Sequence, residues 1–255
     1  LLGEITRQFI ESNKLSADFV ASHGHTIFHN PAAGYTTQIG EGAALANACG
    51  LPVVCDFRTG DVAAGGQGAP LVPMGDALLF SEYNYRLNLG GFANISKQSG
   101  DKIIAFDISP ANIALNYYAN KAGKDFDESG NLAASGQVNE LLLAKLNSLD
   151  YYTLQPPKSL GREWFEEVFL AVTNQYQIAP ADFLNTLCEH IALQIAACLP
   201  TDKTKRLLIT GGGAYNKYLI SRLSDYTDIQ IVIPEKSIID YKEALIFALL
   251  GLLRY

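Results

Sequence analysis

Short apolar segments of two different periodicities divide the chain into predicted helices and strands. Leu2, Ile5 and Phe9 recur at helical spacing, whereas the unbroken apolar run 51–54 is typical of a buried strand. In the first half of the chain, the pattern predicts helices at 1–13 and 41–49 and strands at 19–21, 51–55, 86–89 and 102–106. Polar residues directly follow several of these strands, as they do where open α/β sheets bind ligands.

The second half of the chain is mainly helical. It predicts helices at 111–121, 138–146, 161–174, 180–199, 217–223 and 241–253, and strands at 207–210 and 229–233. Two prolines make residues 151–159 an extended connector. Strands that alternate with helices predict an α/β fold, and 255 residues are near the size at which one core divides into two. We therefore expect two lobes.

The segment 56–73 is the most distinctive stretch of the sequence. It follows a predicted strand and combines Asp56, Arg58 and Asp61 with four glycines, so we expect a glycine-rich loop that approaches a ligand. Residues 22–26 are expected to form another loop after a strand. The alternative for a glycine-rich run taken alone is a surface connection between two elements that binds no ligand.

Composition narrows the class of protein. The chain carries a formal charge of −7, with 48% hydrophobic and 18% charged residues, as in an ordinary globular protein. The longest basic run, residues 203–206, is too short to predict binding to nucleic acid or to an anionic membrane surface. No apolar run reaches the length of about 18 residues that a membrane-spanning helix needs. The four cysteines lack the close spacing of metal ligands, which favours a reducing, cytoplasmic location.

Three glycine turns follow predicted strands, at Gly65–Gly66, Gly90–Gly91 and Gly211–Gly213. Such turns bring backbone N–H groups against an anionic ligand, so three of them on one α/β chain predict a nucleotide. None has the Gly-Lys-Ser/Thr ending of a phosphate-binding loop or the G-x-G-x-x-G spacing of a dinucleotide fold. Those two folds are therefore disfavoured.

Asp107 stands at the end of the strand predicted at 102–106. Its carboxylate either accepts a proton from a hydroxyl or water, or caps the following helix, and the motif alone leaves both roles open. We expect Ser109 to cap that helix and Pro110 to open it.

Three further groups of polar residues are candidates for binding. His23, His25 and His29 suggest a metal site, but no acidic residue is adjacent, so polar loop residues are the favoured interpretation. The cluster Lys158, Ser159 and Arg162 lies at a predicted helix start, where it would hold a carboxylate or phosphate, or form an ordinary cap and surface ion pair. Glu243 is either partly buried and functional or on the solvent face.

Six motifs are distinctive in combination. They are Ser22–Thr26, Asp56–Pro73, Asn88–Ile95, Phe106–Asn112, Lys158–Glu163 and Gly211–Asn216. In this order and at this spacing, they resemble the anhydro-N-acetylmuramic acid kinase family along essentially the whole chain. The resemblance implies the two-lobed fold of sugar kinases, hsp70 and actin, with ATP and sugar bound between the lobes. Residues 1–110 would then be the remainder of the N-terminal lobe, and 111–255 the C-terminal lobe.

The resemblance also implies a reaction and its residues. Water opens the bridge of 1,6-anhydro-N-acetylmuramic acid while ATP phosphorylates O6, a step of peptidoglycan recycling. Asp107 would be the catalytic base, ATP would act with Mg²⁺, whose protein ligands stay unknown, and members commonly form homodimers. The implied substrate-binding set is His23, Arg58, Asp61, Gln67, Asn112, Lys158, Ser159, Arg162 and Glu243, and the nucleotide-binding set is Gly90, Gly91, Asn94, Gly211, Gly212, Gly213 and Asn216.

The sequence departs from the family pattern in three places. His25 stands where the family has Gln, and residues 108–110 read Ile-Ser-Pro where the family has Thr-Gly-Pro. The chain also starts inside a predicted helix, so we expect an N-terminal truncation that removes the opening strands and the first phosphate motif. Two alternative functions stay open: a kinase of another 1,6-anhydro sugar such as levoglucosan, and a non-catalytic sugar-binding module.

Overall fold

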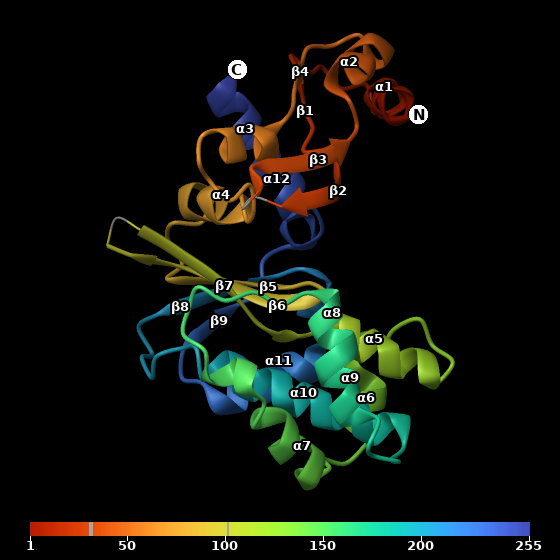
Figure 1. The fold of residues 1–255 in the computed structure, drawn as a ribbon, viewed down its shortest axis with the longest axis vertical. Coiled ribbons are helices and arrows are strands. Elements are labelled where there is room, and N and C mark those ends of the chain that lie inside the picture. The colour runs from red at the N-terminus through yellow and green to blue at the C-terminus, as the bar shows by residue number, and fades with distance from the viewer. Residues whose placement is uncertain (31–32, 101) are drawn as a thin grey trace. The chain divides into compact units, whose positions relative to one another are not determined.

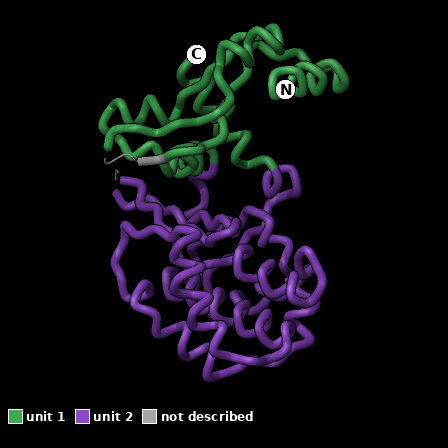
Figure 2. Tube along the Cα trace, turned by 45° about the vertical axis from the view of Figure 1, so that its right-hand side comes forward, with its two compact units in different colours: residues 1–79, 241–255 green, residues 80–240 purple. Residues whose placement is uncertain are grey.

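The computed structural model describes residues 1–30, 33–100 and 102–255. The chain forms two compact units, which Figure 2 distinguishes by colour. Unit 1 comprises residues 1–79 and 241–255, and unit 2 comprises residues 80–240. The lobe boundary expected near residue 110 lies inside unit 2 and stays a prediction.

Unit 1 combines helices with two small pairs of strands. β1 and β4 pair in parallel, and β2 and β3 form an antiparallel hairpin. Its elements are α1 (Leu2–Ser12), β1 (Val20–Ala21), β2 (His25–Asn30), β3 (Tyr35–Ile39), α2 (Gly42–Cys49), β4 (Val53–Val54), α3 (Phe57–Ala63), α4 (Val72–Leu79) and most of α12 (Lys236–Arg254).

Two segments of unit 1 that the sequence predicts as loops contain regular structure. The hairpin β2–β3 begins inside the loop predicted at 22–26, and α3 with the start of α4 lies inside 56–73, so these two loop predictions are wrong. Asp56 adopts a left-handed conformation with φ of 59°, which turns the chain directly into α3. Only the stretch 64–71, between α3 and α4, matches the predicted glycine-rich loop.

Unit 2 contains a five-stranded mixed sheet in the order β7-β6-β5-β8-β9. The strands are β5 (Tyr85–Leu89), β6 (Phe92–Ser99), β7 (Lys102–Pro110), β8 (Arg206–Thr210) and β9 (Gln230–Val232). β5, β6 and β7 pair antiparallel in sequence order, whereas β8 pairs in parallel with both β5 and β9. The α/β class predicted from the sequence is confirmed.

Helices cover one face of this sheet in unit 2 (Figure 1). They are α5 (Asn112–Lys121), α6 (Asn131–Ser135), α7 (Glu140–Asn147), α8 (Arg162–Trp164), a π-helical stretch (Phe165–Phe169), α9 (Leu170–Thr173), α10 (Pro180–Ala196) and α11 (Lys217–Tyr226), with 3-10 turns at Glu128–Gly130, Asp150–Thr153 and Gly212–Tyr215. Ile191 and Ile195 of α10 are completely buried, so this apolar segment belongs to the core of unit 2.

Alternating side chains of the sheet form the other half of that core. Leu87, Leu89, Ala93 and Ile95 are buried in one cluster with residues of α5 and α10. Full burial of an aliphatic side chain of this size contributes about 1.5–3 kcal/mol. Residues between these positions therefore point to the opposite face of the sheet.

The end of β7 differs from the prediction. The strand continues to Pro110, and α5 begins at Asn112 without a side-chain cap. Ser109 is completely buried, and its Oγ has no hydrogen-bond partner among the described residues. The expectations that Ser109 caps this helix and Pro110 opens it are therefore wrong, because both residues belong to the strand.

Two findings concern the state of the cysteines and the presence of a membrane-spanning helix. All four cysteines are free. No helix among the described residues is both long and apolar enough to cross a bilayer.

A buried histidine joins α10 to the chain around α7. His190 is 0% exposed, and its Nδ1 lies 2.6 Å from Oδ1 of Asn147, which also accepts from Gln194. Nδ1 therefore donates, and Nε2 accepts the hydroxyl of Tyr152 at 2.8 Å. Burial lowers the pKa of His190 to about 3. The native structure thus contains the neutral imidazole.

This neutral histidine makes stability depend on pH. Because the folded pKa lies below the ordinary histidine value of 6.5, unit 2 should lose stability as the pH falls from about 6.5 toward about 3, by up to about 1.4 kcal/mol per pH unit. Urea unfolding followed by the fluorescence of Trp164, the single tryptophan of the chain, measures this slope. His190→Gln should flatten it, whereas His25→Gln, an exposed residue of unit 1, is the matched control. Equal slopes for wild type and His190→Gln would contradict the prediction.

Candidate active site

Asp107 lies within β7, opposite Asn94 of β6. The register shifts at this point, because Ala93 pairs with Ser109, which leaves Ile108 as an extra residue in β7. Such a bulge bends a strand and re-aims a side chain, and bulges are common beside active sites. The prediction that Asp107 stands at the end of its strand is therefore wrong, because β7 continues to Pro110 and Asp107 lies directly before a bulge inside it.

The two carboxylate oxygens of Asp107 have different surroundings. Oδ2 accepts a hydrogen bond from the backbone N–H of Leu160 at 2.9 Å, whereas Oδ1 has no partner among the described residues. The side chain is half-buried, and this burial raises the pKa of Asp107 above the ordinary value of an aspartate, against the opposing effect of the Leu160 N–H. A carboxylate with one oxygen fixed and one open is suited to accept a proton. Asp107 does not cap a helix.

Asp107 belongs to a row of polar residues across the sheet. Asp107 pairs with Asn94, Asn94 with Asn88 of β5, and Asn88 with Thr210 of β8. Residues directly opposite each other share a face of the sheet, and this face is opposite to that of Leu87 and its neighbours in the core. Sequence reasoning included Asn94 among the candidates but omitted Asn88, although Asn88 begins one of the distinctive motifs.

The turn Gly90–Gly91 connects β5 to β6 and receives the start of α5. The carbonyl of Gly91 accepts from the N–H groups of Ala111 and Ile113, at 2.8 and 3.1 Å, and the carbonyl of Gly90 accepts from Asn112 at 3.1 Å. These bonds satisfy backbone donors at the first turn of α5, which has no side-chain cap. The turn thus fixes the start of α5 beside the connection between β5 and β6.

The second glycine turn, Gly211–Gly213, leaves β8 in close contact with β5. Gly211 has a φ of 82°, and a Cβ there would lie 2.9 Å from the backbone of Leu89. A Cβ at Gly213 would lie 2.6 Å from Cβ of Leu89, whereas one at Gly212 would meet only Asn112, at 3.6 Å. Gly211 and Gly213 are therefore required for packing, and Gly212 faces open space.

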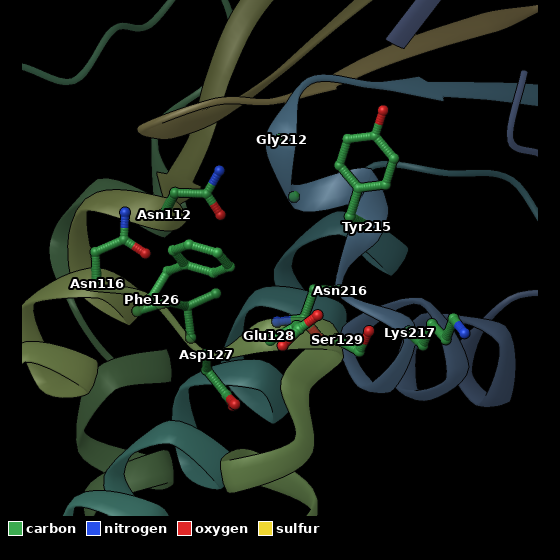
Figure 3. A pocket seen from close by; sticks show the side chains of 12 residues that line it. Asn112, Asn116, Phe126, Asp127, Glu128, Ser129, Gly212, Tyr215, Asn216 and Lys217 are labelled. Carbon is green, nitrogen blue, oxygen red and sulfur yellow. The ribbon is translucent and has the colours of Figure 1, made fainter. Parts of the chain in front are cut away.

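That open space is a cavity of about 540 Å³ within unit 2. Asn112, Phe126 and Tyr215 border it from three different segments of the chain (Figure 3). The complete lining is Asn112, Leu115, Asn116, Phe126, Asp127, Glu128, Ser129, Gly212, Gly213, Tyr215, Asn216 and Lys217. Three members of the predicted nucleotide set, Gly212, Gly213 and Asn216, therefore come together here with Asn112, which the resemblance placed in the substrate set.

Two aromatic residues of this cavity were missed by sequence reasoning. Phe126 is 60% exposed and Tyr215 is 42% exposed. The hydroxyl of Tyr215 donates to Asp240 at 2.7 Å. No sequence pattern marks Phe126, because it stands in a connection between helices. Tyr215 lies inside the distinctive motif Gly211–Asn216.

Several polar groups of the cavity serve the protein itself. Asp127 accepts from the N–H groups of Leu132 and Ala133, both at 2.8 Å, and so caps α6. Oδ1 of Asn216 accepts from Leu219 at 3.0 Å and caps α11. These two side chains hold the cavity wall, and the role predicted for Asn216 in nucleotide binding stays a prediction.

The predicted anion cluster is arranged differently from the expectation. Nζ of Lys158 donates to the carbonyl of Tyr151 at 3.2 Å. Ser159 is exposed, and Arg162, whose side chain is 78% exposed, pairs with Glu166 at 2.7 Å. The surface ion pair that the sequence left open as an alternative is thus present. The substrate roles of all three residues stay predictions.

The remaining substrate candidates belong to unit 1. Arg58 Nη1 donates to the carbonyl of Gly68 at 3.0 Å, and Asp61 accepts from the Gly68 N–H at 2.7 Å, so both side chains fix the glycine-rich stretch. Gln67 and Glu243 are exposed. Their roles in binding stay predictions.

His23 stacks on Phe247 with 4.5 Å between ring centroids, which places it in the packing of unit 1. The side chain of His29 lies outside the described part of the structure. Among the residues that the structure does describe, no group of three or more His, Cys, Asp or Glu side chains is arranged to hold a metal ion.

The mixed sheet, the glycine turns after β5 and β8 and the half-buried Asp107 define an α/β protein with a polar candidate site. The family model for anhydro-N-acetylmuramic acid kinase matches residues 1–255. The chain is 42% identical to the anhydro-N-acetylmuramic acid kinase of Pseudomonas syringae pv. tomato over 94% of its own length and 70% of that protein. It is 35% identical to the protein of the same name from Crocosphaera subtropica, over 99% of this chain and 75% of the relative.

The chain therefore belongs to the anhydro-N-acetylmuramic acid kinase family. This membership confirms the family resemblance that the six motifs predicted. Among solved structures, the activator of 2-hydroxyisocaproyl-CoA dehydratase from Clostridium difficile, with bound ADPNP, is 17% identical, with a TM-score of 0.46 over 85% of this chain and 84% of that chain.

The glycine turn after β8 gives a prediction about stability. Gly213→Ala should destabilise unit 2 by about 1–3 kcal/mol, because the added methyl overpacks the contact with Leu89. Gly212→Ala should change stability by less than about 0.5 kcal/mol, because the methyl enters open space. Chemical denaturation of both variants measures the difference. Equal losses would show that the cavity side of the turn is not open.

Proposed function

We propose that this chain is an ATP-dependent kinase that hydrolytically opens 1,6-anhydro-N-acetylmuramic acid and phosphorylates O6, giving N-acetylmuramic acid 6-phosphate. The names of relatives that cover nearly the whole chain support this substrate. The observation that carries the proposal is the geometry of Asp107, whose Oδ2 is fixed by Leu160 while Oδ1 has no partner among the described residues. We assign the reaction to peptidoglycan recycling in the cytoplasm, by a protein that forms homodimers.

Asp107 would act as the general base. Oδ1 accepts one proton from a water whose oxygen attacks the anomeric carbon, and the second proton stays on the new anomeric hydroxyl. The bond between the anomeric carbon and the bridging oxygen breaks, and its electron pair passes to that oxygen, which becomes O6. A raised pKa suits this role, because a base works best when its pKa lies near the working pH.

O6 then takes the γ-phosphoryl group, and ADP leaves. Phosphoryl transfer depends mainly on positioning and on neutralising negative charge. The backbone around Gly90–Gly91 and Gly211–Gly213 is the proposed partner of the phosphates, with Asn94 on the same polar row as Asp107. The proton on Asp107 returns to solvent after the step.

The cavity beside Gly212 is the proposed site for adenosine. Its exposed rings, Phe126 and Tyr215, offer flat apolar surfaces to a base, and Asn112 offers an amide oxygen because its Nδ2 already donates to the carbonyl of Leu89 at 3.0 Å. Base stacking on an aromatic side chain is worth about 1–3 kcal/mol. We therefore assign Asn112 to the nucleotide side of the site.

Mg²⁺ is proposed to arrive with ATP. The described residues offer no cluster of three metal-binding side chains, but Mg²⁺ commonly binds through phosphate oxygens, waters and only one or two carboxylates. Bound in this way, the ion would neutralise phosphate charge. The proton step at Asp107 requires no contact with it.

Removal of the exposed ring of Phe126 tests the nucleotide site. Phe126→Ala should weaken ADP binding by about 1–3 kcal/mol, because the stacking surface is lost. Isothermal titration calorimetry with ADP measures this change. Leu141→Ala is the matched control, since Leu141 is another exposed apolar residue of unit 2, at 76% exposure, outside the cavity lining. Unchanged affinity in Phe126→Ala would move the adenosine elsewhere.

A reaction in ¹⁸O-water tests the chemistry. With ATP, Mg²⁺ and 1,6-anhydro-N-acetylmuramic acid, mass spectrometry should detect a 6-phosphorylated sugar that carries one heavy oxygen. Asp107→Asn should lower the rate by a factor of about 10²–10⁴, the usual contribution of a general base. For the wild type, kcat/KM should fall on the acid side, through a pKa above that of an ordinary aspartate.

The product incubated alone in ¹⁸O-water is the control for exchange at the anomeric hydroxyl. A phosphorylated product without heavy oxygen beyond this control would reject hydrolytic opening, and full activity of Asp107→Asn would reject Asp107 as the base.

A further inference from the structure

One ten-residue segment, 151–160, holds Asp107 at three points. The hydroxyl of Tyr151 donates to the carbonyl of Asp107 at 2.6 Å, and the N–H of Asp107 donates to the carbonyl of Lys158 at 3.1 Å. The third contact is the bond from Leu160 N–H to Oδ2. β7 lies at the edge of the sheet, so this segment satisfies backbone groups that no neighbouring strand reaches.

Lys158 closes this segment on itself. Its carbonyl binds Asp107, while its Nζ donates to the carbonyl of Tyr151 at 3.2 Å and lies 4.6 Å from the centre of the Tyr151 ring. The side chain is half-buried, and burial lowers the pKa of Lys158. The ammonium group of Lys158 therefore makes its contacts within the protein. A lysine that binds an anionic substrate would instead have its ammonium group exposed to solvent before binding.

Tyr151 is itself fixed by its surroundings. It is 6% exposed, and its ring lies 5.4 Å from that of Trp164 and 5.7 Å from that of Tyr152. Tyr152 in turn binds the buried His190. Burial raises the pKa of Tyr151, so its hydroxyl remains a donor to Asp107 throughout the neutral range.

We propose that Tyr151 and Lys158 are positioning residues for Asp107: they hold the segment 151–160 against β7, so that Leu160 binds Oδ2 and Oδ1 remains open for the proton transfer. This inference rests on the proposed role of Asp107 as base. Under this proposal, Lys158 positions Asp107 and does not bind the carboxylate of the sugar, although the sequence had suggested that role. Neither residue needs to touch the substrate.

The test compares Tyr151→Phe and Lys158→Met with wild type over a range of pH. Each variant should lower kcat by about 3- to 10-fold, the effect of one hydrogen bond, with KM for the sugar within about 2-fold of wild type. Because the Leu160 contact lowers the pKa of Asp107, loosening it should move the acid limb of kcat/KM to higher pH. A neutral 1,6-anhydro sugar, if turned over, should lose the same factor in kcat.

Lys121→Met is the matched control, because Nζ of Lys121 also lies over a tyrosine ring, 4.5 Å from the centre of Tyr117, but outside this segment. It should leave kcat and the acid limb unchanged. A rise in KM confined to the anionic sugar in Lys158→Met, or an unchanged acid limb in either test variant, would overturn the proposal.

A second measurement does not depend on turnover. NMR titration of ¹³C-carboxyl-labelled aspartate, with the Asp107 signal assigned by its absence in Asp107→Asn, should give a higher pKa for Asp107 in both test variants than in wild type. If wild type forms no phosphorylated sugar, the proposed function fails, whereas this titration still decides whether Tyr151 and Lys158 hold the carboxylate. An unchanged pKa in the variants would overturn the positioning role.

Discussion

The alternation of apolar and polar side chains along β5, β6 and β7 is the constraint on which the candidate site depends. Leu87, Leu89, Ala93 and Ile95 must face the helices of unit 2 to be buried, so Asn88 and Asn94 must face the other way. A shift of one residue in register would expose the whole apolar set. Burial of the core thus fixes the direction of the polar row, and the bulge in β7 shifts the register directly after Asp107.

Most strands and long helices were predictable because their signals are local. Apolar runs identified β8 and α10, and glycines marked the turns after β5 and β8. The hairpin β2–β3 was missed because its residues are mostly polar and its pairing is antiparallel over a short range. Helix α3 was missed because Gly60 and the glycines after it outweighed a short helical segment, and propensity is only a weak guide beside tertiary contacts.

The candidate site was predictable to the extent that its residues follow strands or occur in glycine turns. Gly211–Gly213 satisfies this rule, whereas Asp107 and Asn94 lie inside β7 and β6. Phe126 does not satisfy it either, because only the folding of the connection between α5 and α6 brings it to the cavity beside Gly212. The contacts of Lys158 were equally unpredictable, since a lysine near a helix start has the same sequence signature whether its ammonium meets solvent or a buried carbonyl.

The hydrogen bonds in the structure distinguish polar side chains that stabilise the protein itself from polar side chains that remain able to bind a ligand. Asp61 and Asp127 use their carboxylates on backbone N–H groups, so their charge stabilises loop conformations. Asn88 and Asn94 form no side-chain hydrogen bond that the described residues reveal, and one oxygen of Asp107 is equally open. These three neighbouring residues are half-buried, so their polar groups remain available to bind a ligand. We therefore propose this row, and not the more highly charged segment 56–61, as the centre of the site.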